Sequence, residues 1–253
     1  MSKLPKEHKF MDLSDYGRPI ARVIANSLKE TSYTPIDVTI WFIISGLIAI
    51  LCILLGYNWS AAFFLIFKSI LDAADGELAR VKKTPSYTGR YLDSVADIIL
   101  NLCIFIALGY ITDTKFIYTF LAFFGIQLQG TLYNYYYVIL RNHVDGDTTS
   151  RIFENETPIA LKGEKQKDVN ILFGFYKVLY GVFDQIIYTL DSNASTGKRF
   201  PNFLMTALST FGLGFQLLII SLMLVAGYKE YIVYFFLWYS FMIIVFVGIR
   251  KLL

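Results

Sequence analysis

The chain has 253 residues, of which 55% are hydrophobic and only 17% are charged, and its formal net charge is +3. Soluble globular domains carry about 25% charged and about 45–50% apolar residues. The composition therefore excludes a disordered chain, a basic nucleic-acid-binding domain and a small disulfide scaffold. The apolar residues form blocks long enough to cross a bilayer, which argues against an ordinary soluble enzyme.

The first predicted element is an amphipathic helix over residues 16–31. Its apolar residues fall on one side of the helix: Ile20, Val23, Ile24 and Leu28. Basic residues fall mostly on another side, a pattern that favours a helix lying in the membrane interface. A linker helix is the alternative. We expect residues 1–35 to form a cytosolic N-terminus and residues 36–253 to form the membrane domain.

Six apolar blocks are long enough to span the hydrocarbon, which needs about 20 residues. They cover residues 37–57, 59–82, 89–111, 115–140, 203–227 and 230–250.

The segment 142–200 is too long for a bare loop. Within it, residues 168–190 are apolar and aromatic but are interrupted by Lys177 and Asp184. We expect a helix here that packs on the cytosolic face or is partly embedded, because a seventh span would put the basic C-terminus outside. The expected fold is an all-α integral membrane protein with six transmembrane helices, an N-terminal amphipathic interfacial helix and this cytosolic helical insertion.

Basic residues predict the orientation of these spans. Most of them lie before the first span, around the second connection, in the segment 142–200 and after the last span. The other side carries only Lys115 and Lys229. By the positive-inside rule, both termini are cytosolic.

The stretch from residue 72 to residue 97 carries four aspartates at helical spacing. The spacing i, i+3, i+4 and i+7 places four residues on one helix face: Asp72, Asp75, Gly76 and Ala79. The spacing i, i+4 and i+8 places three more on one face of the next helix: Gly89, Asp93 and Asp97. A rise of about 1.5 Å per residue puts the four aspartates roughly 20–27 Å from the far ends of two antiparallel helices. All four carboxylates can therefore meet in one layer near the cytosolic edge of the hydrocarbon.

Four negative charges at this depth need compensation, because even one charge at a helix centre costs about 2.5–3.5 kcal/mol. Oxygen ligands suit Mg²⁺, Mn²⁺ or Ca²⁺ rather than zinc. Gly76 and Ala79 leave room for a ligand, and Arg80 supplies a fork-shaped donor for phosphate. The pattern indicates a site for a metal and a phosphoanion. An ion-coupled transporter would also tolerate such carboxylates, but it does not require the glycine, alanine and arginine.

These residues resemble the signature of the CDP-alcohol phosphotransferase (CDP-alcohol phosphatidyltransferase) family. All eight fixed positions are present, in the pattern Asp72-x2-Asp75-Gly76-x2-Ala79-Arg80-x8-Gly89-x3-Asp93-x3-Asp97. The resemblance covers residues 1–140 well, whereas the last hundred residues match only in hydropathy. It implies transfer of a substituted phosphate from a CDP-linked donor to an alcohol acceptor, with release of CMP. It also implies a homodimer. The absence of nucleic acid as a partner is expected from the composition.

The resemblance implies a role for each signature residue. Asp72, Asp75 and Asp93 would hold divalent metals, two Mg²⁺ or Mn²⁺ ions, and Asp97 would be the general base and touch the second ion. Gly76, Ala79 and Arg80 would border the cytidine and its diphosphate. Gly89 would keep the neighbouring helix close.

Other residues are possible contacts for the acceptor. Lys68 lies one turn before Asp72; a salt bridge that neutralises Asp72 is favoured over contact with an acceptor phosphate. Arg141, Lys198 and Arg199 are ordinary positive-inside anchors or acceptor-binding residues.

Two further groups of residues are interpreted as packing. The aromatic cluster of Tyr135, Tyr136 and Tyr137 indicates core or interfacial contacts. Gly212 and Gly214 indicate close approach of helices.

The residues around the signature, DGELARVKK and SYTGRYLD, resemble the inositol-related branches of the family most, and we expect a phospholipid synthase. We expect CDP-diacylglycerol as the donor and a phosphorylated polyol, such as inositol phosphate, as the acceptor. A branch that uses CDP-choline, CDP-ethanolamine or CDP-inositol is the alternative, and an ion-coupled transporter is a distant one.

Overall fold

The computed structural model describes residues 4–144, 154, 156–196 and 200–253. Within these ranges every regular element is a helix. The α-helices are α1 (Arg18–Leu28), α2 (Pro35–Leu54), α3 (Asn58–Lys82), α4 (Tyr87–Ile111), α5 (Phe116–His143), α6 (Gln166–Leu190), α7 (Asn202–Leu208), α8 (Leu213–Val225), α9 (Ile232–Tyr239) and α10 (Met242–Leu252). Four short 3-10 turns join them: η1 (Lys6–His8), η2 (Leu13–Asp15), η3 (Ser209–Phe211) and η4 (Lys229–Tyr231).

The turn between α3 and α4 sets the geometry of the two signature helices. α3 ends at Lys82, and the next residue, Lys83, adopts a left-handed backbone conformation with φ of 55°. α4 begins after Ser86, whose hydroxyl accepts a hydrogen bond of 2.8 Å from the Gly89 N–H. A side-chain cap of this kind satisfies one of the unpaired N–H groups that begin every helix. The short turn reverses the chain, so α3 and α4 run antiparallel and their side chains meet at the aspartates, as the spacing predicts.

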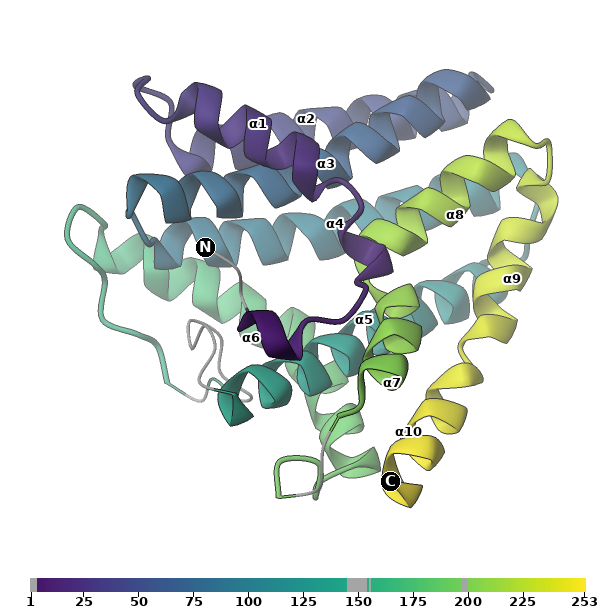
Figure 1. Ribbon diagram of the computed structural model, residues 1–253. Coiled ribbons are helices and arrows are strands. Elements are labelled where there is room, and N and C mark those ends of the chain that lie inside the picture. Colours follow the sequence, from purple (N-terminus) through teal and green to yellow (C-terminus); the bar gives the residue numbers. More distant parts are fainter. Residues whose placement is uncertain (1–3, 145–153, 155, 197–199) are drawn as a thin grey trace.

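The helices form a bundle around these two. α2 packs against both α3 and α4, while α1 and α8 contact α3, and α5 and α6 contact α4 (Figure 1). The largest apolar cluster lies between α3, α4, α5, α8 and α9 and includes Leu65, Phe105 and Phe236. The N-terminal segment crosses the bundle and reaches the junction of η3 and α8.

The outer surface of the bundle is apolar along the helix sides. On α2, five residues at i, i+4, i+7, i+11 and i+14 are 44–55% exposed: Ile40, Ile44, Leu47, Leu51 and Leu54. A stripe of this kind is unfavourable in water but suits contact with lipid chains. Together with the long apolar helices, it makes the chain an all-α integral membrane protein.

The predicted spans match the helices closely, with two breaks. The fifth predicted span is bent by 56° between Asn202–Phe211 and Leu213–Val225, and the sixth is built from η4, α9 and α10. By length and apolar composition alone, five helices qualify as spans, or six with the bent pair. That set includes α6 and leaves out α3, which carries the signature charges.

The two ends of α6 contact different helices. Near its start, Phe173 packs against Tyr91 with ring centroids 5.4 Å apart. At its end, Asp191 accepts a hydrogen bond from Tyr136 and pairs with Arg250 at the end of α10. The start of α6 therefore contacts the first turns of α4, and its end contacts α5 and the end of α10. The predicted helix in 168–190 is confirmed.

The predicted N-terminal helix is confirmed as α1, but its apolar stripe is divided. Ala21 and Ala25 are buried against α3, whereas Ile20 and Val23 are 55% and 69% exposed. The small alanines allow α1 to lie close to α3, and the larger residues point away from the bundle, where they suit contact with a membrane interface.

Candidate active site

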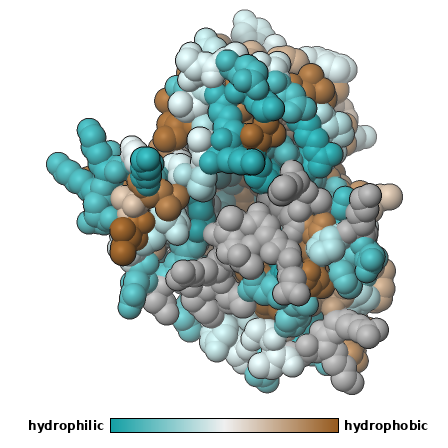
Figure 2. Space-filling view, turned by 60° about the vertical axis from the view of Figure 1, so that its left-hand side comes forward, coloured by the Kyte–Doolittle hydropathy of each residue, from teal (hydrophilic) through white to brown (hydrophobic). Residues whose placement is uncertain are grey.

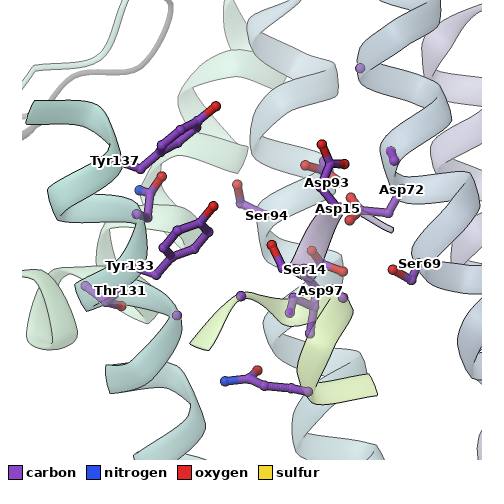
Figure 3. Close-up of a pocket in the computed structure, with 18 of the residues that line it drawn as sticks. Ser14, Asp15, Ser69, Asp72, Asp93, Ser94, Asp97, Thr131, Tyr133 and Tyr137 are labelled. Atoms are coloured by element: carbon purple, nitrogen blue, oxygen red, sulfur yellow. The ribbon is translucent and has the colours of Figure 1, made fainter. Parts of the chain in front are cut away.

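A cavity of about 510 Å³ lies at the signature end of the bundle. Side chains from α3, α4, α5 and α6 line it, together with the N-terminal segment and the start of α8. Hydrophilic residues gather on this end of the molecule (Figure 2). Inside the cavity, Tyr133 and Tyr137 extend from α5 toward the carboxylates of Asp93 and Asp97 on α4 (Figure 3).

Three of the four signature aspartates form one compact cluster. One carboxylate oxygen from each of Asp72, Asp75 and Asp93 lies within 4.8 Å of the others. Asp75 accepts a hydrogen bond of 2.7 Å from Thr39, whereas Asp93 Oδ1 is buried and has no hydrogen-bond partner among the described residues. No lysine or arginine in those parts of the chain forms an ion pair with the three. Close carboxylates with an unused buried oxygen fit a divalent cation that prefers oxygen ligands.

Asp97 lies next to this cluster and has a different partner. Its Oδ1 accepts a hydrogen bond of 2.5 Å from Lys68 Nζ. Lys68 is fully buried, and its ammonium lies 4.9 Å from the centroid of the Phe42 ring. The predicted salt bridge from Lys68 to Asp72 is therefore corrected, because the direct partner is Asp97. Lys68 does not line the cavity, so this geometry does not favour contact with an acceptor.

Arg80 belongs to a group of arginines around one buried carboxylate. Glu77 is 3% exposed and accepts a hydrogen bond of 2.6 Å from Arg18, while Arg80 lies 3.2 Å from the same oxygen. Burial alone would lower the pKa of Arg18, but its bonds to Asp15 and Glu77 raise that pKa above its ordinary value. Arg18 and Arg80 both line the cavity, so two held guanidinium groups face it.

The small signature residues have separate places. Gly76 lines the cavity, and the Arg80 guanidinium, 3.5 Å away, is the nearest group to the position of an added Cβ. A Cβ on Gly89 would lie 3.5 Å from Ile36 of α2, so Gly89 allows α4 to pack closely against α2. Ala79 and Gly89 do not line the cavity.

The wall opposite the aspartates comes from α5 and contains residues that the sequence did not indicate. Tyr133 donates a hydrogen bond of 2.6 Å to Asp12. The Arg141 guanidinium lies 5.4 Å from the centroid of the Tyr137 ring, and both residues line the cavity. Tyr137 is thus part of the site, while Tyr135 and Tyr136 are buried as predicted. Lys198 and Arg199 lie outside the described residues.

The N-terminal segment closes one side of the cavity. The Leu13 N–H donates a hydrogen bond of 2.8 Å to Ser209, and Ser14 sits against two glycines. A Cβ on Gly214 would lie 2.0 Å from the Ser14 carbonyl oxygen, and one on Gly212 would lie 2.3 Å from the Ser14 Cβ. The predicted close approach at Gly212 and Gly214 is confirmed. Its nearest partner is this segment, and a Cβ on Gly214 would also lie 3.1 Å from the hydroxyl oxygen of Ser69 on α3.

The segment between α5 and α7 contributes to the cavity and to the start of α4. Glu164 accepts hydrogen bonds of 2.7 Å from the Ser86 hydroxyl and 2.8 Å from the Thr88 N–H. Burial would raise the pKa of Glu164, but these bonds lower it below its ordinary value. Tyr180 and Asp184 of α6 line the cavity. In the sequence, the only signal for Asp184 is that it interrupts an apolar run.

Comparison with protein families agrees with this site. Residues 33–154 match the family model of CDP-alcohol phosphatidyltransferases, and this range includes all four signature aspartates. No curated protein matches the chain significantly. The family transfers substituted phosphate groups, which fits a cavity with a carboxylate cluster on one side and arginines around it. Residues 33–154 are therefore a CDP-alcohol phosphatidyltransferase domain, the domain of a family that transfers substituted phosphate groups.

Proposed function

We propose that the enzyme transfers a phosphatidyl group from CDP-diacylglycerol to a polyol phosphate such as inositol phosphate, with release of CMP. The family supports a phosphotransferase role in phospholipid synthesis. The observation that carries the finer proposal is the cluster of Asp72, Asp75 and Asp93, which shares one cavity with arginines from α1, α3 and α5. Such a cavity suits substrates that carry phosphate groups at both the donor and the acceptor.

Asp72, Asp75 and Asp93 are the residues that would hold Mg²⁺ or Mn²⁺, with Asp97 near enough in sequence and space to touch a second ion. The bound metal would supply positive charge to the donor diphosphate and to the leaving CMP. The chain's own cations provide a second source of charge at the same substrate. Arg80 and Arg18 are held by Glu77 and face the cavity, where they bind diphosphate oxygens. Gly76 leaves open space beside them for the nucleotide.

Asp97 is the proposed general base. The acceptor hydroxyl gives its proton to Asp97, and its oxygen attacks the phosphorus that carries diacylglycerol. A new phosphorus–oxygen bond forms, the bond from this phosphorus to the bridging oxygen breaks, and CMP leaves. Lys68 is a positioning residue, because its hydrogen bond of 2.5 Å holds the Asp97 carboxylate in one orientation.

A lipid donor is supported by an apolar groove between α2 and α3. The groove has a volume of about 250 Å³ and is lined by Trp41, Ile44, Ser45, Ile48, Phe64, Phe67 and Leu71. Leu71 directly precedes Asp72, so the groove reaches the level of the carboxylate cluster. An acyl chain of the donor fits its apolar lining, while Arg141 on the opposite wall binds the acceptor phosphate. We place this site and both termini on the cytosolic side.

The test is CMP release by the purified full-length protein with Mg²⁺, CDP-diacylglycerol and a panel of soluble acceptors that includes inositol phosphate, glycerol phosphate, inositol and serine. The proposal expects metal-dependent release with inositol phosphate above the other acceptors. Release only with CDP-choline, CDP-ethanolamine or CDP-inositol would overturn the donor assignment. No CMP release with any donor would overturn the proposed reaction.

A further inference from the structure

Asp184 lies on α6, outside the range that matches the family model, and yet it lines the same cavity as the signature aspartates. Its neighbours on α6 show how it is directed there. Tyr180, one turn earlier, donates a hydrogen bond of 2.9 Å to the Ser94 carbonyl of α4. Phe183 packs its ring 4.9 Å from that of Phe124 on α5. These contacts place Asp184 on the part of α6 that packs against α4 and α5.

Asp184 is acted on by the like charge of Glu154, and the helices that face it present polar, uncharged side chains to the cavity. Gly109 and Thr119 face each other where α4 and α5 meet, so counting back along the two antiparallel helices pairs Asn101 with Gln127. The same count pairs Asp97 with Thr131, one turn nearer the mouth. Asn101, Gln127 and Thr131 all line the cavity. The part of the cavity beyond Asp97 thus has amides and a hydroxyl facing α6.

The arginines of the cavity belong to its other end. By the same count, Arg141 pairs with the first turn of α4, where Arg90 also lies. Arg18 and Arg80 are held at Glu77, near the end of α3. Asp184 has no hydrogen bond and no ion pair with any residue in the described part of the chain. It is a partly buried carboxylate that faces the cavity without a cation from the protein.

An ionised carboxylate only accepts hydrogen bonds, so its ligand must carry a donor. A single carboxylate beside two amides offers too few charged oxygens to compete with the three-aspartate cluster for a divalent cation. The remaining partners are a hydroxyl or an ammonium group on a substrate. The acceptor alcohol must reach Asp97 with its reacting hydroxyl, and Asp184 lines the same cavity, where a second group of the same molecule can contact it.

We propose that Asp184 is a specificity-determining residue, which binds a second hydrogen-bond donor of the acceptor alcohol, either a hydroxyl or an ammonium group. This inference rests on the proposed transferase function. On this proposal α6 determines which acceptor binds, whereas α3 and α4 bind the metals and the nucleotide. Asp184 does not increase the affinity for an acceptor whose reacting hydroxyl is its only hydrogen-bond donor.

The experiment measures binding of acceptors to the full-length protein without donor, by calorimetry, for the wild type and the variants Asp184→Asn and Asp184→Ala. The probes are inositol phosphate, inositol and serine. Asp168→Asn is the matched control, because Asp168 is an exposed residue of the same helix that does not line the cavity. CDP binding in the presence of Mg²⁺ reports whether each variant keeps the rest of the site.

The expected result is acceptor affinity weakened about tenfold or more in Asp184→Ala, the size expected for a lost bond to a charged group. CDP affinity stays unchanged, and Asp168→Asn behaves as the wild type. A hydroxyl ligand is indicated if Asp184→Asn keeps much of the affinity for inositol, because an amide oxygen still accepts. An ammonium ligand is indicated if Asp184→Asn loses affinity for serine as fully as Asp184→Ala does.

Equal affinity of wild type and Asp184→Ala for every acceptor that the wild type binds would overturn the inference, as would absence of binding of all three probes to the wild type. Failure of the proposed function is distinguishable. In that case the wild type binds an acceptor through Asp184 but releases no CMP when CDP-diacylglycerol and Mg²⁺ are added.

Discussion

Glu77 and Asp75 are two residues apart on α3, both are buried, and their surroundings are opposite. Three arginines lie within 3.8 Å of the Glu77 carboxylate: Arg18, Arg22 and Arg80. Asp75 instead lies in a cluster with Asp72 and Asp93 that has no ion pair in the described parts of the chain. A buried charge needs a partner of opposite sign. The described parts of the protein supply that partner to Glu77 and none to the aspartate cluster, which can therefore take a cation from solution.

The largest expected effect comes from breaking the aspartate cluster. Asp93→Asn removes one of three oxygen ligands, so metal-dependent CMP release should fall about a thousandfold or more, because metal charge stabilisation is worth several kcal/mol. The metal-free variant should melt at a higher temperature than the metal-free wild type, since one repelling charge is gone. Unchanged CMP release in Asp93→Asn would remove it from the metal site.

The pair of Asp97 and Lys68 lies between Glu77 and the aspartate cluster, because the Asp97 carboxylate has one cationic partner within the protein. Loss of a general base lowers the rate by about 10²- to 10⁴-fold. We expect this loss in Asp97→Asn, but that variant leaves Lys68 buried without its partner and destabilises the fold. The double variant Asp97→Asn, Lys68→Met removes both charges and provides the control.

The double variant should fold, bind CDP with Mg²⁺ and remain inactive. Turnover in the folded double variant would contradict the assignment of Asp97 as the base. Lys68→Met alone should lower kcat more than it raises KM for the acceptor, because Lys68 positions Asp97 and does not line the cavity.

Removing the charge of Glu77, whose arginine partners neutralise it, should lower thermal stability, whereas Asp93→Asn should raise it in the absence of metal. Glu77→Gln leaves Arg18 and Arg80 without their shared carboxylate. We expect a loss of about 1.5–3 kcal/mol, the range for hydrogen bonds to charged groups. Thermal melting in detergent, without metal, measures both variants under the same conditions. Equal shifts of the same sign in Glu77→Gln and Asp93→Asn would contradict the comparison.

The smallest effect is expected at Glu164, which is partly exposed. Its pKa is lowered in the folded protein, so its contribution is present above its unfolded pKa and is lost as the pH falls through the folded value. Glu164→Gln should cost less than about 1 kcal/mol at pH 7, because solvent screens the site. Melting of wild type and Glu164→Gln across pH should converge in acid. A difference that grows as the pH falls would contradict this sign.

The sequence predicted much of this arrangement because helical spacing carries it. The i, i+3 and i+4 positions of Asp72, Asp75 and Gly76 place them on one face of α3, and the structure brings Asp93 to them as the antiparallel geometry requires. Long apolar runs predicted the helices to within a few residues. The side chains that point along one helix face are predictable without knowledge of the neighbouring helices.

Features that depend on how helices cross were not predictable. Lys68 is one turn from Asp72 in sequence, but the crossing of α3 and α4 brings it to Asp97. Ser14 lies in a short 3-10 turn without periodicity, and nothing in the sequence pairs it with Gly214. The packing of α6 against α4 and α5 decides that Asp184 lines the cavity, whereas the apolar composition of α6 suggests only a membrane helix.

Direct measurement of metal binding tests the central claim, that the aspartate cluster is completed by a divalent cation. Metal-free full-length protein is titrated with Mn²⁺ and the free ion is followed by electron paramagnetic resonance, for the wild type, Asp93→Asn and Glu77→Gln. We predict saturable binding of up to two ions in the wild type and in Glu77→Gln, and its loss or strong weakening in Asp93→Asn. No saturable binding in the wild type, or equal binding in Asp93→Asn, would contradict the claim.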